Sequence, residues 1–268
     1  MKFGLIVEDN PISRCYLKIL IESNKVLKNL IILDGKKFWP SSVFLRLSFY
    51  KNNYWPLKFL KEKNYLFLSH QIEDYFNFPR NFCKEMYKFK NIYNVSRKVQ
   101  FTNHKNINSE STIEVIKNTE SELFLNTGKQ IYKDVLDLNK KFIHIHPGFL
   151  PEIKGADGSL WHIKKQLNIG VSSFFMNKKI DEGQVIKREK LPLPRFSLKN
   201  YEELPVQTIY RIWFSFFDPL LRGWHLKKLI KKEEFTVEKN AENFLDSQYF
   251  SFMNQDELKN TFEKIFKK

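Results

Sequence analysis

The stretch KFIHIHPGFLP, residues 141–151, reads as an apolar strand that stops at a proline. Pro147 ends the strand, since its nitrogen carries no proton for a sheet hydrogen bond. Side chains two residues apart on a strand share a face, so His144 and His146 point the same way at its carboxyl end. Paired imidazoles in such a place suit acid–base chemistry or, with further ligands, zinc binding.

Strands and helices alternate along the chain on both sides of this stretch. The hydrophobic spacing predicts strands at residues 2–7, 30–33, 99–101, 123–128 and 141–146, and helices at residues 11–24, 111–118 and 131–138. This order predicts an α/β fold, a Rossmann-like, mostly parallel sheet with helices on both faces. Ligands of such sheets bind beyond the carboxyl ends of the strands, where Gly128 and His146 fall. In the irregular, aromatic-rich residues 36–95 we expect one strand, at residues 65–68.

The loop after the first strand limits the choice of cofactor. It reads EDNP, residues 8–11, where a dinucleotide-binding fold has G-x-G-x-x-G, so NAD is not expected. The same opening resembles a response-regulator receiver domain, but the chain has no Asp between Asp34 and Asp74 to accept a phosphoryl group. We therefore reject that resemblance and expect Asp9 or Asn10 to cap the helix that follows.

Charge and composition exclude several classes of protein. The 268 residues carry 45 Lys and Arg against 30 Asp and Glu, a net charge of +15, and 16% are aromatic, so the chain should fold around a core. The lysines are dispersed without a nucleic-acid-binding motif, which favours a small anionic substrate over a nucleic acid partner. Two cysteines without metal spacing, and an N-terminal apolar run too short for a signal peptide or membrane span, predict a cytoplasmic protein without a membrane partner.

Six of the nine glycines lie between residues 128 and 183, together with several titratable side chains. Glycine allows positive φ and close backbone approach, so this window is the candidate site. Asp181 is the one good candidate for a third zinc ligand beside the two histidines. Asp157 either contacts a substrate hydroxyl or amine or caps the helix predicted at residues 159–167, and we favour the cap. For His162, on that helix, we expect a structural role.

The window resembles the signature of folate-dependent formyltransferases, the family that includes methionyl-tRNA, glycinamide ribonucleotide and sugar-nucleotide N-formyltransferases. That signature is N-x-H-P-S/G-x-L-P, a glycine, G-V/A-T/S-x-H and D-x-G-x-I/V-I. It is similar, in order, to HIHPGFLP at residues 144–151, Gly155, GVS at residues 170–172 and IDEGQVI at residues 180–186. The resemblance covers about residues 95–190. It implies a catalytic domain at residues 1–195 and a small helical and hairpin region at residues 196–268.

The resemblance also implies a role for each matching position. His146 corresponds to the family's catalytic histidine and Asp181 to its catalytic aspartate. A substrate amine would attack the formyl carbon of 10-formyltetrahydrofolate, while His146 assists proton transfer and Asp181 orients it. The family's asparagine is His144 here, which makes His144 a third catalytic candidate, and the family's later histidine is Phe174. The remaining contacts are expected with the folate at Gly128, Pro147 and Gly183, and with the substrate at Asp157 and Phe174.

The length of the C-terminal region, residues 196–268, limits which molecule could accept the formyl group. About 70 residues are too few for the β-barrel domain of a methionyl-tRNA formyltransferase and more than a glycinamide ribonucleotide enzyme has. A nucleotide-linked amino sugar is therefore the favoured acceptor. The region should form a helix at residues 208–231 interrupted at Pro219, a strand at residues 248–253 and a helix at residues 256–266, and its apolar side chains suit core or homodimer contacts.

Two alternatives to this function stay open. One is a formyltransferase-like hydrolase, or a metal-dependent enzyme, that uses His144, His146 and Asp181 in another way. The other is a non-catalytic protein that binds RNA or another anion. Bound zinc, formate release without an acceptor, or tight RNA binding would distinguish them from a transferase.

Overall fold

The computed structural model describes residues 3–33, 54–88, 92–232, 235–238 and 247–266. The strands are β1 (Gly4–Val7), β2 (Leu30–Ile32), β3 (Val99–Phe101), β4 (Leu123–Asn126), β5 (Lys141–His146), β6 (Ile153–Gly155), β7 (Asn168–Phe175), β8 (Val185–Pro192) and β9 (Gln248–Phe250). The α-helices are α1 (Pro11–Glu22), α3 (Lys63–Tyr75), α4 (Phe82–Glu85), α5 (Glu110–Lys117), α6 (Gly158–Gln166), α7 (Val206–Ile212), α8 (Asp218–Lys232) and α9 (Gln255–Phe266).

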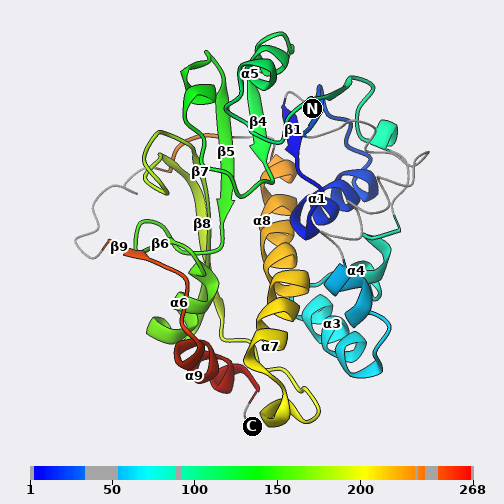
Figure 1. Ribbon diagram of the computed structural model, residues 1–268, viewed down its shortest axis with the longest axis vertical. Coiled ribbons are helices and arrows are strands. Elements are labelled where there is room, and N and C mark those ends of the chain that lie inside the picture. The colour runs from blue at the N-terminus through cyan, green and yellow to red at the C-terminus, as the bar shows by residue number, and fades with distance from the viewer. Residues whose placement is uncertain (1–2, 34–53, 89–91, 233–234, 239–246, 267–268) are drawn as a thin grey trace.

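Seven strands form one sheet in the order β3-β2-β1-β4-β5-β7-β8. The first five are parallel to one another, and β7 and β8 run antiparallel at one edge. The strand order reverses between β1 and β4, and the crevice at such a reversal is where open α/β sheets bind ligands. The predicted mostly parallel α/β fold is confirmed (Figure 1).

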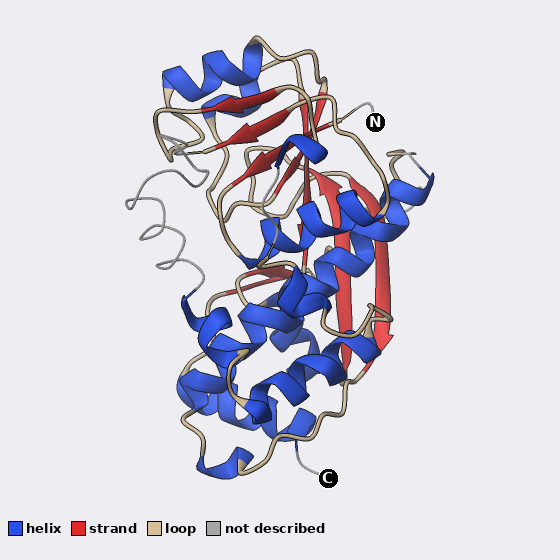
Figure 2. Ribbon diagram, turned by 90° about the vertical axis from the view of Figure 1, so that its right-hand side faces the viewer, coloured by secondary structure: helices blue, strands red, loops and turns tan. Residues whose placement is uncertain are grey.

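Helices cover both faces of the sheet because its strands are apolar on both sides. In β1, Leu5 and Val7 enter one core cluster and Ile6 the other, as the two-residue period of a strand requires. The first core contains side chains of α1 and α8, and the second contains side chains of α5 and of a 3₁₀ turn at Asp134–Asp137. Figure 2 shows most of the remaining helices gathered at the other end of the molecule from the first strands.

The first helix has the predicted cap. Asn10 Oδ1 accepts from the Ser13 N–H at 2.9 Å, and the Ser13 hydroxyl oxygen accepts from the Asn10 N–H at 3.1 Å. Asp9 instead binds Arg14 through both oxygens, at 2.6 and 2.9 Å. The capping prediction is therefore confirmed at Asn10, which fixes where the chain turns away from β1.

Two predicted elements are wrong. Residues 65–68 belong to α3, where the buried Tyr65, Leu68 and Ile72 recur at the three- and four-residue spacing of a helix. Residues 131–138 contain only the 3₁₀ turn at Asp134–Asp137. The Asn108 side chain takes the Ile131 carbonyl, which a helix over these residues would use, and also accepts from the Lys133 N–H. Residues 36–53 of the aromatic-rich part lie outside the described residues.

The C-terminal region contributes a long helix to the sheet. After α7, a π-helical turn at Trp213–Phe217 leads into α8, and Pro219 is the second residue of α8, so the predicted interruption is confirmed. Helix α8 packs against α1, β5 and β7 (Figure 1). The boundary between residues 195 and 196 stays a prediction, although one apolar core contains side chains from both sides of it. No helix in the described part of the chain is long and apolar enough to span a membrane.

Candidate functional site

A cavity of about 380 Å³ lies beyond the carboxyl ends of β4 and β5. It is lined by side chains from β4, β5, α8, β9 and the loops between them. Seven of the eight predicted site residues line it: Gly128, His144, His146, Pro147, Asp157, Phe174 and Asp181. The fold therefore brings together residues that are up to 53 positions apart in the sequence, from Gly128 to Asp181.

Gly183 is the predicted residue that does not line the cavity. A Cβ atom at Gly183 would lie 1.6 Å from the Phe175 carbonyl oxygen, so only glycine fits against the end of β7. Gly183 follows Asp181 by two residues, and its close packing against β7 shapes the loop that carries Asp181. The predicted folate contact at Gly183 stays a prediction.

His146 is buried at the end of β5, with an acceptor at each ring nitrogen. Nε2 lies 2.9 Å from the Ile153 carbonyl oxygen and Nδ1 lies 3.5 Å from Asp181 Oδ2. A Cβ atom at Gly148 or Gly158 would lie 2.6 or 3.0 Å from Nε2, so these two glycines leave room for the ring. This arrangement accommodates a ring that carries protons on both nitrogens.

Asp181 is held by the loop that follows β7. Its backbone is left-handed, with φ of 55°, and its Oδ2 accepts from the Gly155 N–H at 2.8 Å. Burial alone would raise the pKa of this carboxyl, but the neighbouring rings of His146 and His144 and the Gly155 N–H outweigh burial and lower it. Asp181 is therefore an ionised group beside His146.

His144 has donors at both ring nitrogens, the reverse of His146. Nδ1 lies 3.3 Å from Asn126 Nδ2, and Nε2 lies 3.3 Å from Arg222 Nη1. The ring of Phe174 meets the His144 ring edge to face, with centroids 5.9 Å apart. Burial, followed by the positive charge of Arg222, lowers the pKa of His144 to about 3. His144 is therefore neutral at physiological pH.

Arg222 and Asn126 are site residues that the sequence motif does not reveal. Arg222 reaches the cavity from α8, donates from Nε to Asp218 Oδ2 at 2.9 Å, and donates from Nη1 to the Ile145 carbonyl. Asn126 Oδ1 accepts from the Gly128 N–H and the Tyr132 hydroxyl, at 2.7 and 3.0 Å. The one sequence signal for Arg222 is its four-residue spacing from Asp218, which places an ion pair on one helix face.

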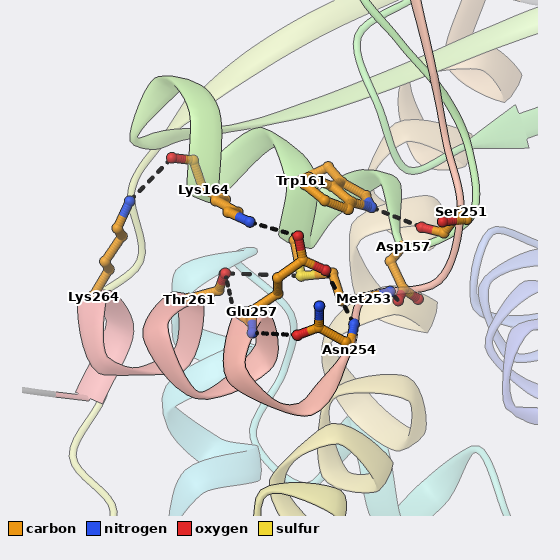
Figure 3. Close-up of polar contacts among 9 residues, drawn as sticks. All are labelled: Asp157, Trp161, Lys164, Ser251, Met253, Asn254, Glu257, Thr261 and Lys264. Carbon is orange, nitrogen blue, oxygen red and sulfur yellow. Dashed lines mark hydrogen bonds and ion pairs between the residues drawn. The ribbon is translucent and has the colours of Figure 1, made fainter.

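Asp157 does not cap α6 with its side chain, so that prediction is wrong. It occupies the N-cap position, but its left-handed backbone, with φ of 52°, directs the carboxylate elsewhere. Oδ1 accepts from the Tyr210 hydroxyl at 2.8 Å. Oδ2 accepts from the Met253 N–H at 2.9 Å, as Figure 3 shows. Burial raises the pKa of this carboxyl. Asp157 therefore ties α6 to α7 and to the segment between β9 and α9.

The rim of the cavity is aromatic and basic. Tyr249 and Phe252, from β9 and the segment after it, are 62% and 73% exposed and line the cavity together with Phe214. The exposed lysines Lys129, Lys178 and Lys179 also line it. Within the described ranges, no group of three or more His, Cys, Asp and Glu side chains has the arrangement of a metal site.

Comparisons with known proteins return solved formyltransferases. No family model matches the chain, and no curated protein matches it. A sugar N-formyltransferase from a Shewanella species is 17% identical, with 94% of this chain and 77% of that one covered and a TM-score of 0.48. An N-formyltransferase from Helicobacter canadensis, solved with folinic acid and dTDP-3-aminofucose, is 16% identical over 94% and 71% of the two chains, with a TM-score of 0.49.

A phosphoribosylglycinamide formyltransferase from Streptococcus pneumoniae is also similar. It is 16% identical, with 88% of this chain and 100% of that one covered and a TM-score of 0.45. The chain is similar to these solved formyltransferases, which belong to the family that the motif at residues 144–151 resembles.

Proposed function

We propose that the protein is an N-formyltransferase that moves a formyl group from 10-formyltetrahydrofolate to an amine of a small acceptor, a nucleotide-linked amino sugar. The observation that carries the proposal is the buried pair of His146 and Asp181, 3.5 Å apart, at the strand ends that line the cavity. A histidine beside an ionised carboxylate is a group that can take up and return a proton near neutral pH.

The proposed reaction transfers one proton from the acceptor nitrogen to N10 of the folate. The acceptor nitrogen forms a bond to the formyl carbon, the bond from that carbon to N10 of the folate breaks, and the proton leaves the acceptor nitrogen for N10. 10-Formyltetrahydrofolate supplies the electrophilic formyl carbon when bound. His146 is the group in the cavity that can carry the proton, and Asp181 stabilises its charged form.

The lining of the cavity suits both proposed substrates. Ile131, Phe174, Met176 and Ile180 offer apolar walls for a planar ring, and Tyr249 and Phe252 extend that surface at the rim. The lysines of the rim, Lys129, Lys178 and Lys179, can pair with the carboxylates of a folate or with the phosphates of a nucleotide. Gly128 and Pro147 line the same cavity and are proposed folate contacts.

We also propose a reducing compartment, the cytoplasm, for this activity. Both cysteines of the chain, Cys15 and Cys83, are buried and unpaired. Burial raises the pKa of both thiols, so neither is a reactive nucleophile.

The test is a transferase assay with matched histidine variants. Purified protein is incubated with 10-formyltetrahydrofolate and a panel of amino-sugar nucleotides, and tetrahydrofolate release is followed. We expect release that depends on one acceptor, and a loss of about 10²- to 10⁴-fold in kcat for His146→Ala and Asp181→Asn. His104→Ala, at an exposed histidine that does not line the cavity, is the control and should match the wild type.

Three outcomes would contradict this function. No tetrahydrofolate release with any acceptor, together with no folate binding, removes it. Formate release without an acceptor points instead to a hydrolase that uses the same residues. RNA binding that survives both substitutions, without turnover, points to a non-catalytic protein.

A further inference from the structure

Arg222 is a buried cation that lines the catalytic cavity although it belongs to the C-terminal region. Its side chain is 10% exposed. Nε donates to Asp218 Oδ2 at 2.9 Å, and Nη1 donates to the Ile145 carbonyl, so the guanidinium plane is fixed from two sides. Asp218 is itself 1% exposed, which holds the pair in place.

The third nitrogen of this guanidinium is Nη2. No hydrogen bond to Arg222 Nη2 is present among the described residues, whereas Nε and Nη1 are both engaged. Nη2 is not among the buried side-chain nitrogens that lack a partner in the described part of the chain, so it is open to the cavity rather than sealed in the core. Because Arg222 lines the cavity, Nη2 is a free double donor at the site.

The neighbouring His144 cannot supply such a donor. Its ring nitrogens lie 3.3 Å from Asn126 Nδ2 and 3.3 Å from Arg222 Nη1, and both of those groups are themselves donors. Asn126 cannot reverse its amide, because Oδ1 accepts from the Gly128 N–H and the Tyr132 hydroxyl. A neutral His144 ring can accept from one of these donors only, and its single N–H then points at the other donor and not into the cavity, where an asparagine would offer a free N–H.

We propose that Arg222 forms an oxyanion site in the cavity, in which Nη2 binds the formyl oxygen as it becomes negative, and that this replaces the neutral donor absent at position 144. The inference rests on the proposed formyl transfer. A fixed guanidinium suits this task, because its charge-assisted hydrogen bonds strengthen as negative charge develops on the oxygen. Arg222 moves no proton. Attack by the amine turns the carbonyl bond into a single bond with the electron pair on oxygen, and that pair returns when the bond to N10 breaks.

Formate tests this site without the folate or the acceptor, because its negatively charged oxygens resemble the formyl oxygen after the amine has added to the formyl carbon. Binding of formate to the full chain is measured by calorimetry for the wild type, Arg222→Gln and Arg222→Lys. We expect the dissociation constant to rise about tenfold or more in Arg222→Gln, with an intermediate value in Arg222→Lys, which keeps the charge but loses the planar fork. Arg80→Gln, at an exposed arginine that does not line the cavity, should match the wild type.

The transferase assay gives the second readout. We expect kcat to fall about 10²- to 10³-fold in Arg222→Gln, while KM for either substrate changes little, since the interaction forms in the transition state. A far-ultraviolet spectrum and thermal midpoint like those of the wild type show that the variant is folded, and if Arg222→Gln is not folded, the comparison is made on Arg222→Lys.

The formate and transferase measurements distinguish a missing oxyanion site from a missing formyltransferase activity. Wild-type protein that binds no formate, or a folded Arg222 variant that keeps wild-type formate affinity or kcat, overturns the oxyanion site even when formyl transfer is found. Formate binding that depends on Arg222, without any formyl transfer by the wild type, supports the anion site and removes the transferase.

Discussion

His144 and His146 are two residues apart on one strand, yet their ring nitrogens face opposite kinds of hydrogen-bonding group. The nitrogens of His146 face a carbonyl and a carboxylate, and those of His144 face an amide and a guanidinium. Donors at both nitrogens disfavour a protonated His144 ring. Pairs of titratable groups whose environments differ in this way commonly divide acid–base work from positioning. In the proposed reaction His146 is the proton carrier, and His144 is a fixed neighbour.

This contrast predicts how His144→Asn behaves. Because the pKa of His144 is lowered to about 3, the ring gains no proton between about pH 5 and 9. The shape of the kcat profile over that range should therefore be the same in the wild type and in His144→Asn, with kcat within about tenfold. Measuring kcat against pH for both proteins checks this. The idea fails if an inflection of the wild-type profile is missing in the variant.

Asp157 links three helical elements: α6, α7 and the segment that leads into α9. Its carboxylate accepts from Tyr210 on α7 and from Met253, which leads into α9, while its backbone begins α6. Asp157→Ala should lower the free energy of unfolding by about 3 kcal/mol, since two buried donors lose a charged partner. Tyr210→Phe removes one of the two bonds and should cost about 1 kcal/mol.

Urea denaturation of the two variants measures these costs. Equal losses in both would contradict the assigned roles, because Tyr210→Phe leaves the Met253 contact in place. Transferase activity is also measured for the folded fraction of each variant. A loss of activity in folded Asp157→Ala, but not in folded Tyr210→Phe, would support the predicted contact between Asp157 and the substrate.

The segment after β9 carries aromatic side chains to the cavity rim. Phe252 is 73% exposed, so its side chain contributes little to the core. If it stacks on a ring of a substrate, a contact worth about 1–3 kcal/mol, Phe252→Ala should raise the KM of that substrate about tenfold or more and leave kcat and the thermal midpoint nearly unchanged. Phe67→Ala removes another exposed phenylalanine, on α3, and is the control. An unchanged KM for both substrates would show that the rim ring does not stack.

Local signals in the sequence predicted some elements and missed others for physical reasons. The strand at residues 141–146 is apolar and ends at a proline, and it forms as predicted. The helix predicted at residues 131–138 is missing because the side chain of Asn108, 23 residues before Ile131, binds the Ile131 carbonyl that the first turn of that helix would use. The same side chain also accepts from the Lys133 N–H. Such a long-range bond leaves no trace in hydrophobic spacing. Arg222 was missed for the same reason, since only folding brings α8 beside β5.

Buried neutral histidines make the free energy of unfolding of the whole protein depend on pH. Burial lowers the pKa of His162 to about 4, although nearby Asn168 offsets part of this effect, and neither ring nitrogen makes a hydrogen bond of good geometry among the described residues. Burial also lowers the pKa of His225. In the unfolded chain these rings take up protons below about pH 6.5, so the unfolded state binds more protons and stability falls as pH drops from there. For His162 the loss is complete near its folded pKa of about 4.

His162→Leu should therefore flatten the pH dependence. Replacing an imidazole without hydrogen bonds of good geometry by an apolar side chain of similar size should leave the free energy of unfolding at pH 7 equal or higher, and raise it further at pH 5. Denaturation at the two pH values measures both effects. A variant that loses as much stability as the wild type between them would contradict the prediction. Buried Asp157, whose pKa is raised, acts in the opposite direction in both proteins, so it cancels in the comparison.

The place of Arg222 in the chain has a consequence for synthesis. The two histidines and Asp181 are made before α8, and Arg222 and Phe252 follow them. A ribosome-bound chain that ends before residue 222 can already hold the strand with both imidazoles, but it lacks the guanidinium and the rim side chains Tyr249 and Phe252. The cavity is therefore complete only once α8 and the segment after β9 have joined the earlier-made sheet.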